Sequence, residues 1–294
     1  MKILVFGSLN IDLVFSVDHV AAPGETIAST ALVKSAGGKG ANQAAALARA
    51  GMPVYMAGKI GADGQFLVDL LESYGVNTGG VIRYGGATGQ AIIQLDRNSQ
   101  NAIVLYPGGN GAITVEEAQA VLGEFGAGDT VVLQNEISCL GEIITLAKKR
   151  ALRVCLNPSP CDGTIAQLPL ELVDMFFVNE IEGATLASMP AAAPLPEVLD
   201  ELVRRFPRAE IVLTAGSGGA YYGSGAYRTK GDAVPVQVAD TTGAGDTFTG
   251  YFIAARAQNM PVPQALAAAC KAASITVSRF GAMESIPAAG EVWG

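Results

Sequence analysis

Short apolar runs recur along the chain, and each ends in a group of glycine or polar residues. The strands predicted from them lie at residues 3–6, 130–134, 154–156, 175–178 and 211–213. Continuous apolar runs of this length are typical of strands buried in a parallel sheet. Helical patterns lie between them, as in the alanine-rich segment 41–50 that stops at Gly51. The alternation predicts a three-layer α/β fold, in which helices cover both faces of a mainly parallel sheet.

Four further short strands are predicted outside this alternation. They lie at residues 13–17, 27–33, 89–96 and 101–107. The first two flank a turn that contains Pro23 and Gly24, and the polar stretch 97–100 joins the last two as in a β-hairpin.

Composition and charge narrow the class of protein. Half of the 294 residues are hydrophobic and 36 are glycine, and the glycines fall in short clusters without a repeat. We expect one domain that spans residues 1–294 and has many tight loops. A net charge of -8 with scattered Lys and Arg argues against nucleic acid or a membrane surface as a partner.

Cysteine and histidine usage argues against a zinc site. The four cysteines form no Cys-x-x-Cys pair, and His19 is the only histidine. We expect reduced thiols in a cytoplasmic protein, with neither a signal peptide nor a membrane-spanning run.

One stretch combines a predicted strand at 234–239, a glycine turn and a predicted helix at 248–257. Its central sequence is Asp240-Thr-Thr-Gly-Ala-Gly-Asp246-Thr-Phe248. The N–H groups of residues 243–245 and the helix dipole would attract an anion. A carboxylate here makes sense if Asp246 is a base beside a transferred phosphoryl group. Asp246 could equally be an N-cap residue, and this stretch alone leaves both readings open.

Polar residues also follow the first predicted strand. Asn10 and Asp12 are two positions apart, so on an extended backbone their side chains point the same way and could bind adjacent hydroxyls. Ordinary turn chemistry is the alternative. A second glycine cluster, 37–40, precedes the helix at 41–50. It is no P-loop, because Gly40 follows Lys39 where Ser or Thr would be needed to hold magnesium.

The segments 240–248 and 35–44 resemble the C-terminal and N-terminal signatures of the ribokinase-like (PfkB) carbohydrate kinases. The resemblance extends from Gly7 to Ser285, with the motifs in the family's order. It implies a ribokinase-like fold with a small β-sheet lid, formed by about 12–34 and 88–107. One departure is Tyr251, where the family usually has Ala or Gly.

The resemblance also implies roles for individual residues. Asp246 would be the catalytic base, and Gly243, Ala244 and Gly245 the anion hole. Contacts to sugar hydroxyls would come from Asn10, Asp12, Gly38, Lys39, Asn42 and Glu136. Contacts to ATP would come from Asn179, Thr214, Gly216, Ser217, Gly219 and Gly245. The adenine pocket near residues 267–271 offers Ala269, Cys270 and Lys271, which suggests mainly apolar contact with the base.

Two cation sites follow from the same resemblance. Glu182 would bind Mg²⁺ through water, although a first-turn glutamate favoured by the helix dipole is the alternative. A monovalent cation, K⁺, would be bound by a carboxylate and backbone carbonyls at Asp240, Thr242, Thr276, Arg279, Gly281 and Ser285.

The expected function is transfer of the γ-phosphoryl group of ATP to the primary hydroxyl of a neutral sugar, ribose, by a homodimer that pairs through its lid. Fructose, 2-keto-3-deoxygluconate or a nucleoside are alternative substrates. A non-catalytic sugar or nucleotide sensor on the same fold is a further alternative. A dinucleotide-dependent oxidoreductase is a weaker one, because Gly7-Ser8-Leu9-Asn10 lacks the Gly-x-Gly-x-x-Gly pattern.

Overall fold

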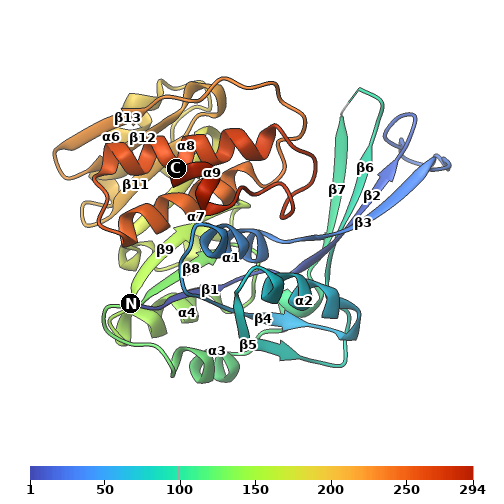
Figure 1. Ribbon diagram of the computed structural model, residues 1–294, viewed down its shortest axis with the longest axis horizontal. Coiled ribbons are helices and arrows are strands. Elements are labelled where there is room, and N and C mark those ends of the chain that lie inside the picture. Colours follow the sequence, from blue (N-terminus) through green and yellow to red (C-terminus); the bar gives the residue numbers. More distant parts are fainter. Residues whose placement is uncertain (99, 294) are drawn as a thin grey trace.

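The structure is a computed structural model that describes residues 1–98 and 100–293. In these residues the strands form a nine-stranded sheet and a separate four-stranded sheet (Figure 1). The large sheet has the spatial order β13 (Tyr227–Gly231), β12 (Ala220–Ser224), β11 (Glu210–Thr214), β10 (Met175–Asn179), β9 (Arg153–Asn157), β8 (Thr130–Gln134), β1 (Ile3–Phe6), β4 (Val54–Ile60) and β5 (Asn77–Arg83). The small sheet, called the lid, has the order β3 (Ala31–Gly37), β2 (Asn10–Ser16), β6 (Gly89–Leu95) and β7 (Asn101–Tyr106).

The large sheet is parallel from β5 to β11, and only β12 and β13 run antiparallel to their neighbours. The predicted α/β class is therefore confirmed. The strands predicted at 3–6 and 130–134 have the observed bounds, and those predicted near 155, 176 and 212 are longer by one residue at one or both ends.

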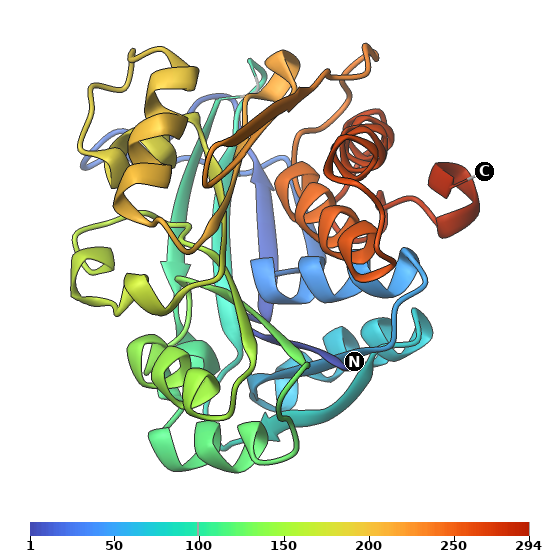
Figure 2. The same cartoon turned by 90° about the vertical axis from the view of Figure 1, so that its left-hand side faces the viewer.

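Helices cover both faces because side chains alternate along each strand. In β1, Ile3 and Val5 join one buried cluster, whereas Leu4 and Phe6 join the other. The first face carries α1 (Lys39–Arg49), α2 (Gln65–Ser73), α7 (Ala244–Ala257), α8 (Val262–Val277) and α9 (Ala289–Trp293). The opposite face carries α3 (Val115–Leu122), α4 (Leu140–Lys149), α5 (Glu180–Ala187) and α6 (Leu195–Arg205), as Figure 2 shows. In the described part of the chain, no helix combines the length and the apolar character needed to cross a bilayer.

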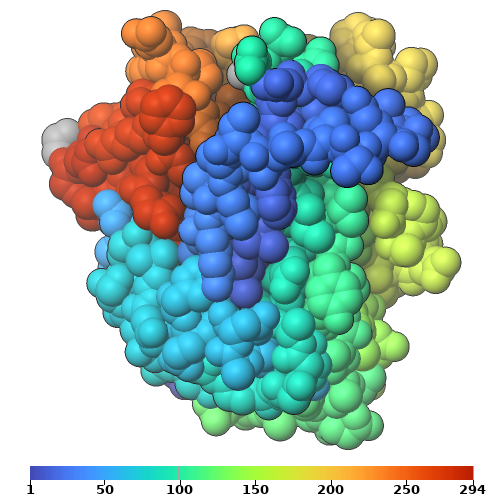
Figure 3. All heavy atoms as spheres, turned by 90° about the vertical axis from the view of Figure 1, so that its right-hand side faces the viewer, coloured from blue at the N-terminus to red at the C-terminus, as the bar shows by residue number. Residues whose placement is uncertain are grey.

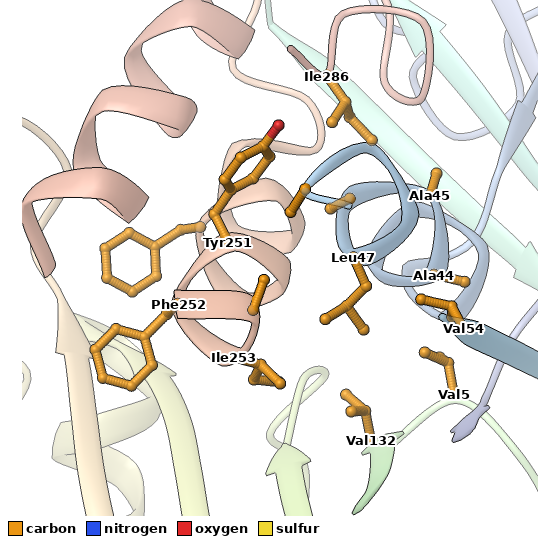
Figure 4. Packing of buried hydrophobic residues seen from close by; sticks show 14 of the residues in the cluster. Val5, Ala44, Ala45, Leu47, Val54, Val132, Tyr251, Phe252, Ile253 and Ile286 are labelled. Atoms are coloured by element: carbon orange, nitrogen blue, oxygen red, sulfur yellow. The ribbon is translucent and has the colours of Figure 1, made fainter. Parts of the chain in front are cut away.

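Close packing of α7 on α1 brings the start of each helix to the same place. A Cβ atom on Gly250 would lie 2.5 Å from Cβ of Ala46, so only glycine fits at this contact. The unusual Tyr251 is fully buried in the same core, where Figure 4 shows it beside Phe252 and Ile253. Its hydroxyl donates to the Pro287 carbonyl oxygen at 2.7 Å. The core therefore accommodates the tyrosine with its polar atom satisfied.

The lid strands differ from the prediction at their ends. The segments predicted at 13–17 and 27–33 are β2 and β3, which cover 10–16 and 31–37, and residues 27–30 form no strand. β2 and β3 pair antiparallel as far as Asn10 and Gly37, so both strands reach the glycine cluster at residues 37–40. The lid is thereby joined directly to the part of the chain that holds the large sheet. The hairpin predicted from 89–96 and 101–107 is confirmed as β6 and β7. The lid projects from the large sheet in Figure 1 and is outermost on the face shown in Figure 3.

The strand predicted at 234–239 is wrong. These residues form no ladder, in keeping with Pro235, which has no N–H to donate. The helix predicted to begin at 248 begins at Ala244, with Gly243 as its N-cap at φ 74°. Asp246 therefore lies inside the first turn of α7.

Candidate active site

The carboxylate of Asp246 is bound by two amides from the start of α1. Asn42 Nδ2 donates to Oδ2 and Gln43 Nε2 donates to Oδ1, each at 2.9 Å. Gly243, not Asp246, occupies the N-cap position of α7, so the capping interpretation of Asp246 is wrong. The side chain instead faces the glycine cluster at residues 37–40.

Neighbouring charges tune this carboxylate. Burial raises the pKa of Asp246, Lys39 and the two amides lower it, Glu136 raises it, and the net direction is upward. For Lys39, burial lowers the pKa of the ammonium, but Asp246, Glu136 and Glu182 outweigh it and raise that pKa. Lys39 therefore stays charged, while Asp246 is a stronger base than an ordinary aspartate.

Glu136, just beyond β8, lies against the same glycine cluster. Its Oε2 accepts hydrogen bonds from the Ser8 hydroxyl and, at 3.4 Å, from the backbone N–H of Lys39. Its Oε1 lies 3.6 Å from the Lys39 ammonium. Ser8 also accepts a hydrogen bond from the backbone N–H of Gly40 at 3.2 Å. Side chains from β8, from the loop after β1 and from α1 thus converge.

Asn10 and Asp12 lie on β2, where the lid leaves the domain core. Asn110 donates to Asn10 Oδ1 at 2.7 Å, which fixes the orientation of the Asn10 amide. A Cβ on Gly37 would lie 2.0 Å from Asp12 Oδ2, so the glycine makes room for this carboxyl group. Burial, followed by repulsion from Glu136, raises the pKa of Asp12 to about 7. Asp12 is therefore near enough to Glu136, Lys39 and Asp246 to be affected by their charges.

Only the NH₂ group of the Asn42 side chain has a hydrogen-bond partner among the described residues. Its Nδ2 binds Asp246, but Oδ1 is buried and accepts no hydrogen bond from any residue that the structure describes. Only 5% of the residue is exposed. A buried amide oxygen without a donor is costly, so the amide keeps this orientation because its NH₂ group binds Asp246.

A small polar cavity adjoins Asp246 on the side away from the lid. Its volume is about 190 Å³, and its lining includes Lys39, Asn179, Glu182, Gly245 and Asp246. Asn179 and Glu182 form a capping box: Asn179 Oδ1 accepts from the Glu182 N–H at 2.8 Å, and Glu182 Oε2 accepts from the Asn179 N–H at 3.0 Å. Magnesium commonly binds one or two carboxylates together with substrate phosphates, and Glu182 fits that requirement.

A larger cavity of about 520 Å³ shares Thr214 and Gly245 with the polar one. Its lining is mainly apolar and includes the expected Gly216, Ser217 and Gly219. The pocket near α8 differs from the prediction in its residues. Cys270, Ala273 and Val277 line it, but Ala269 is buried in the core, and Lys271 donates to the Val292 carbonyl oxygen at 3.0 Å.

Comparison with known proteins decides the family. Residues 1–289 match the pfkB family carbohydrate kinases. The chain belongs to this family. It is therefore an ATP-dependent carbohydrate kinase.

Full-length relatives include several ribokinases. The ribokinase of Bacillus subtilis is 33% identical, with 99% of this chain and 98% of that protein covered. The bifunctional ribokinase/ribose-5-phosphate isomerase A of Fructilactobacillus sanfranciscensis is 34% identical over 97% of this chain, which spans only 54% of that longer protein. The structure is similar to that of Arabidopsis thaliana ribokinase complexed with ribose and ATP, with a TM-score of 0.88, 30% identity and coverage of 99% and 97%.

Two loops of this carbohydrate kinase meet beside the start of α7. Asp240 Oδ1 accepts hydrogen bonds from the backbone N–H and the hydroxyl of Thr242, and Oδ2 accepts from the Gly281 N–H at 3.1 Å. Burial raises the pKa of Asp240, but these hydrogen bonds outweigh it and hold the pKa below its ordinary value. Arg279 pairs with Glu291. An ionised carboxylate between two loops fits the donor set that a monovalent cation requires.

The remaining predicted cation ligands lie in the same region. Thr276 is fully buried and its hydroxyl donates to Thr247 Oγ1 at 3.0 Å, and the Ser285 hydroxyl donates to the Ala282 carbonyl oxygen at 2.7 Å. Both hydroxyls donate their hydrogen, which leaves their oxygen lone pairs available beside Asp240 and the backbone carbonyls of the two loops.

Sequence reasoning missed Ser8, Gln43, Asn110 and Gln134 as members of the site. Ser8 and Gln43 stand next to motif residues, but nothing in the motif says which way they point. Gln134 is a buried glutamine at the end of an otherwise apolar strand, and that mismatch is the one sequence signal that could have found it.

Proposed function

We propose that this kinase transfers the γ-phosphoryl group of ATP to the primary hydroxyl of ribose, with Asp246 as the general base. The supporting observation is the position of Asp246: the Asn42 and Gln43 amides orient its carboxylate, which lines the small polar cavity together with Lys39 and Gly245. A sugar hydroxyl that enters this cavity would lie beside the base.

The polar cluster suits a neutral sugar better than a sugar phosphate. Its positive group is Lys39, which already faces the carboxylates of Glu136 and Asp246. Asn10, Asp12, Asn42 and Glu136 add amide and carboxylate groups that can pair with several hydroxyls.

In the reaction, Asp246 removes the proton of the primary hydroxyl as its oxygen bonds to the γ-phosphorus and the bond to the bridging oxygen of ADP breaks. The N–H groups of Gly243 and Gly245 at the start of α7 would stabilise the charge on the transferred group, and the Ala244 N–H would join them on leaving the Thr241 carbonyl oxygen, to which it donates at 3.3 Å. Bound Mg²⁺ supplies further charge neutralisation on the phosphates. Glu182 would hold the ion through its waters, and Asn179 would lie near the phosphates.

Nucleotide binding falls to the larger cavity. Thr214, Gly216, Ser217 and Gly219 would lie along the phosphates and ribose of ATP, and the apolar wall that includes Cys270 would contact adenine. K⁺ bound near Asp240 would join the loop at 240–242 to the loop at 279–285 and so fix the amides of residues 243–245.

We also propose a domain organisation and a contact between two copies of the chain. The chain would act as one kinase domain spanning 1–294, with the lid inserted at about 12–34 and 88–107. Exposed apolar side chains on the lid, including Val33, Val104 and Leu105, would pair with a second copy. Because the reaction consumes ATP, a cytoplasmic location suits the enzyme.

An ADP-release assay over a substrate panel tests the proposal. The panel comprises ribose, 2-deoxyribose, fructose, 2-keto-3-deoxygluconate, adenosine and fructose 6-phosphate. The expected result is the highest kcat/KM for ribose, with a loss of about 10²-fold or more where a bound hydroxyl is missing. A higher kcat/KM for fructose or adenosine rejects ribose, and absence of ADP release with all substrates rejects catalysis.

A further inference from the structure

A line of buried side chains runs from Asp246 into the core between α1 and β8. Gln134 Nε2 donates to Gln43 Oε1 at 2.7 Å, and Gln43 Nε2 donates to Asp246 Oδ1 at 2.9 Å. Gln43 and Gln134 have no exposed surface. The Gln43 and Gln134 amides are thus buried beside the carboxylate, and neither residue lines the polar or the apolar cavity.

The acceptor character of the Asp246 carboxylate fixes the direction of both hydrogen bonds. An ionised carboxylate can only accept hydrogen bonds, so Gln43 must present its NH₂ group to Asp246. Its carbonyl oxygen then points at Gln134, which must donate in turn. Gln134 can keep this orientation only by leaving its own Oε1 without a partner among residues 1–98 and 100–293.

The surroundings of Gln134 are shaped for that orientation. A Cβ on Gly7 would lie 1.9 Å from Gln134 Oε1, so the glycine leaves room for this oxygen. An unpaired buried amide oxygen works against stability, and an apolar residue at the end of β8 would avoid that cost. Gln134 is therefore better explained by what it does to Gln43 than by what it contributes to the fold.

We propose that Gln43 and Gln134 are positioning residues that, with Asn42, hold the Asp246 carboxylate in one orientation, so that its free lone pair faces the substrate hydroxyl. The functional part of this inference rests on the proposed role of Asp246 as base. The structural part, an amide line that favours the charged carboxylate, does not depend on activity.

Other charged groups near Asp246 determine how its pKa would change if the hydrogen bonds from Gln134 to Gln43 and from Gln43 to Asp246 were lost. Lys39 favours the charged carboxylate, whereas Glu136 and Asp12 oppose it. Removing the Gln43 donor leaves Lys39 and Asn42 to offset burial and both acids. The pKa of Asp246 is then expected to rise, because hydrogen bonds to the charged form favour that form.

Three variants separate positioning from packing. Gln43→Met removes the donor. Gln134→Glu keeps the shape of the side chain but replaces the NH₂ donor by a carboxylate oxygen, which accepts. The Gln43 amide must then turn its NH₂ group toward residue 134, so that its oxygen faces Asp246. Lys59→Met is the matched control: its ammonium is also buried, with 6% of the residue exposed, but it binds Glu117 and the Ala112 carbonyl oxygen.

The experiment titrates the Asp246 carboxyl group by ¹³C NMR in protein labelled at the aspartate carboxyl carbon, with Asp246→Asn used to identify the signal. Gln43→Met and Gln134→Glu are expected to raise the Asp246 pKa by about one unit or more, and Lys59→Met to leave it unchanged. The acid limb of the kcat–pH profile with ribose should move by the same amount. Melting temperatures report the loss of stability separately.

An Asp246 titration that stays at the wild-type position in both glutamine variants overturns the inference. A shift that Lys59→Met reproduces also overturns it, because general destabilisation would then explain the change. A titration that shifts while the kcat profile does not would leave the amide line in place and instead refute Asp246 as the base.

Discussion

The carboxylate of Asp246 accepts a 2.9 Å hydrogen bond from the side-chain amide of Asn42, a residue 204 positions earlier in the chain. The contact exists because α7 packs on α1 through Gly250 and Ala46, which aligns the first turns of the two helices. The proposed base, Asp246, thus binds directly to Asn42, a residue proposed to contact the sugar.

Asp12 is expected to make sugar use depend on pH near neutrality. Its pKa is raised to about 7 by burial and then by Glu136. Below that pH the carboxyl group is protonated and offers fewer acceptors to sugar hydroxyls. We therefore expect kcat/KM for ribose to fall by about tenfold per pH unit on the acid side and to level off on the alkaline side. Asp12→Asn should remove this limb, and an unchanged limb in the variant would assign the titration to another group.

Glu182 is expected to control magnesium dependence. In Glu182→Gln, the Mg²⁺ concentration for half-maximal rate should rise on the order of tenfold, because the ion loses a charged partner. Glu117→Gln is the matched control, since Glu117 forms the same kind of capping box with Thr114 at the start of α3. Equal magnesium curves for the two variants would show that Glu182 only caps its helix.

Asp240 is expected to carry the effect of potassium. At constant ionic strength, wild-type activity should be about fivefold or more higher in K⁺ than in a bulky organic cation, and Asp240→Asn should abolish the difference. The measurement is kcat with each chloride salt in turn. Equal wild-type rates in Na⁺, K⁺ and the organic cation would remove this site from the account.

The lid is expected to form the contact between two copies. Val104 is 62% exposed on β7, and Val104→Asp should convert a dimer into a monomer because it places a charge in an apolar contact. Ile181→Asp is the control, because Ile181 is 69% exposed but lies on α5, outside the lid. Light scattering gives the mass of each variant, and a monomeric wild type would refute the lid contact.

The sequence allowed the α/β class, the strands that carry the site and most motif residues to be predicted, because strand ends and glycine turns leave local signals. The interior of the site left only one, the polar Gln134 at the end of a buried strand. Gln43 reaches Gln134, which is 91 positions away, and neither residue shows its partner in its own neighbourhood. The strand predicted at 234–239 failed for a related reason: alternating valines indicate a strand only where a neighbour can pair, and Pro235 has no N–H to offer.

The most direct test of the account is Asp246→Asn, which keeps the size of the side chain and removes its basicity. With ribose and MgATP, kcat is expected to fall by about 10²- to 10⁴-fold while KM changes far less, because a general base acts mainly in the transition state. Calorimetric binding of ribose should remain, which would show that the site is intact. A kcat near the wild-type value in this variant would contradict the assignment of Asp246 as the base.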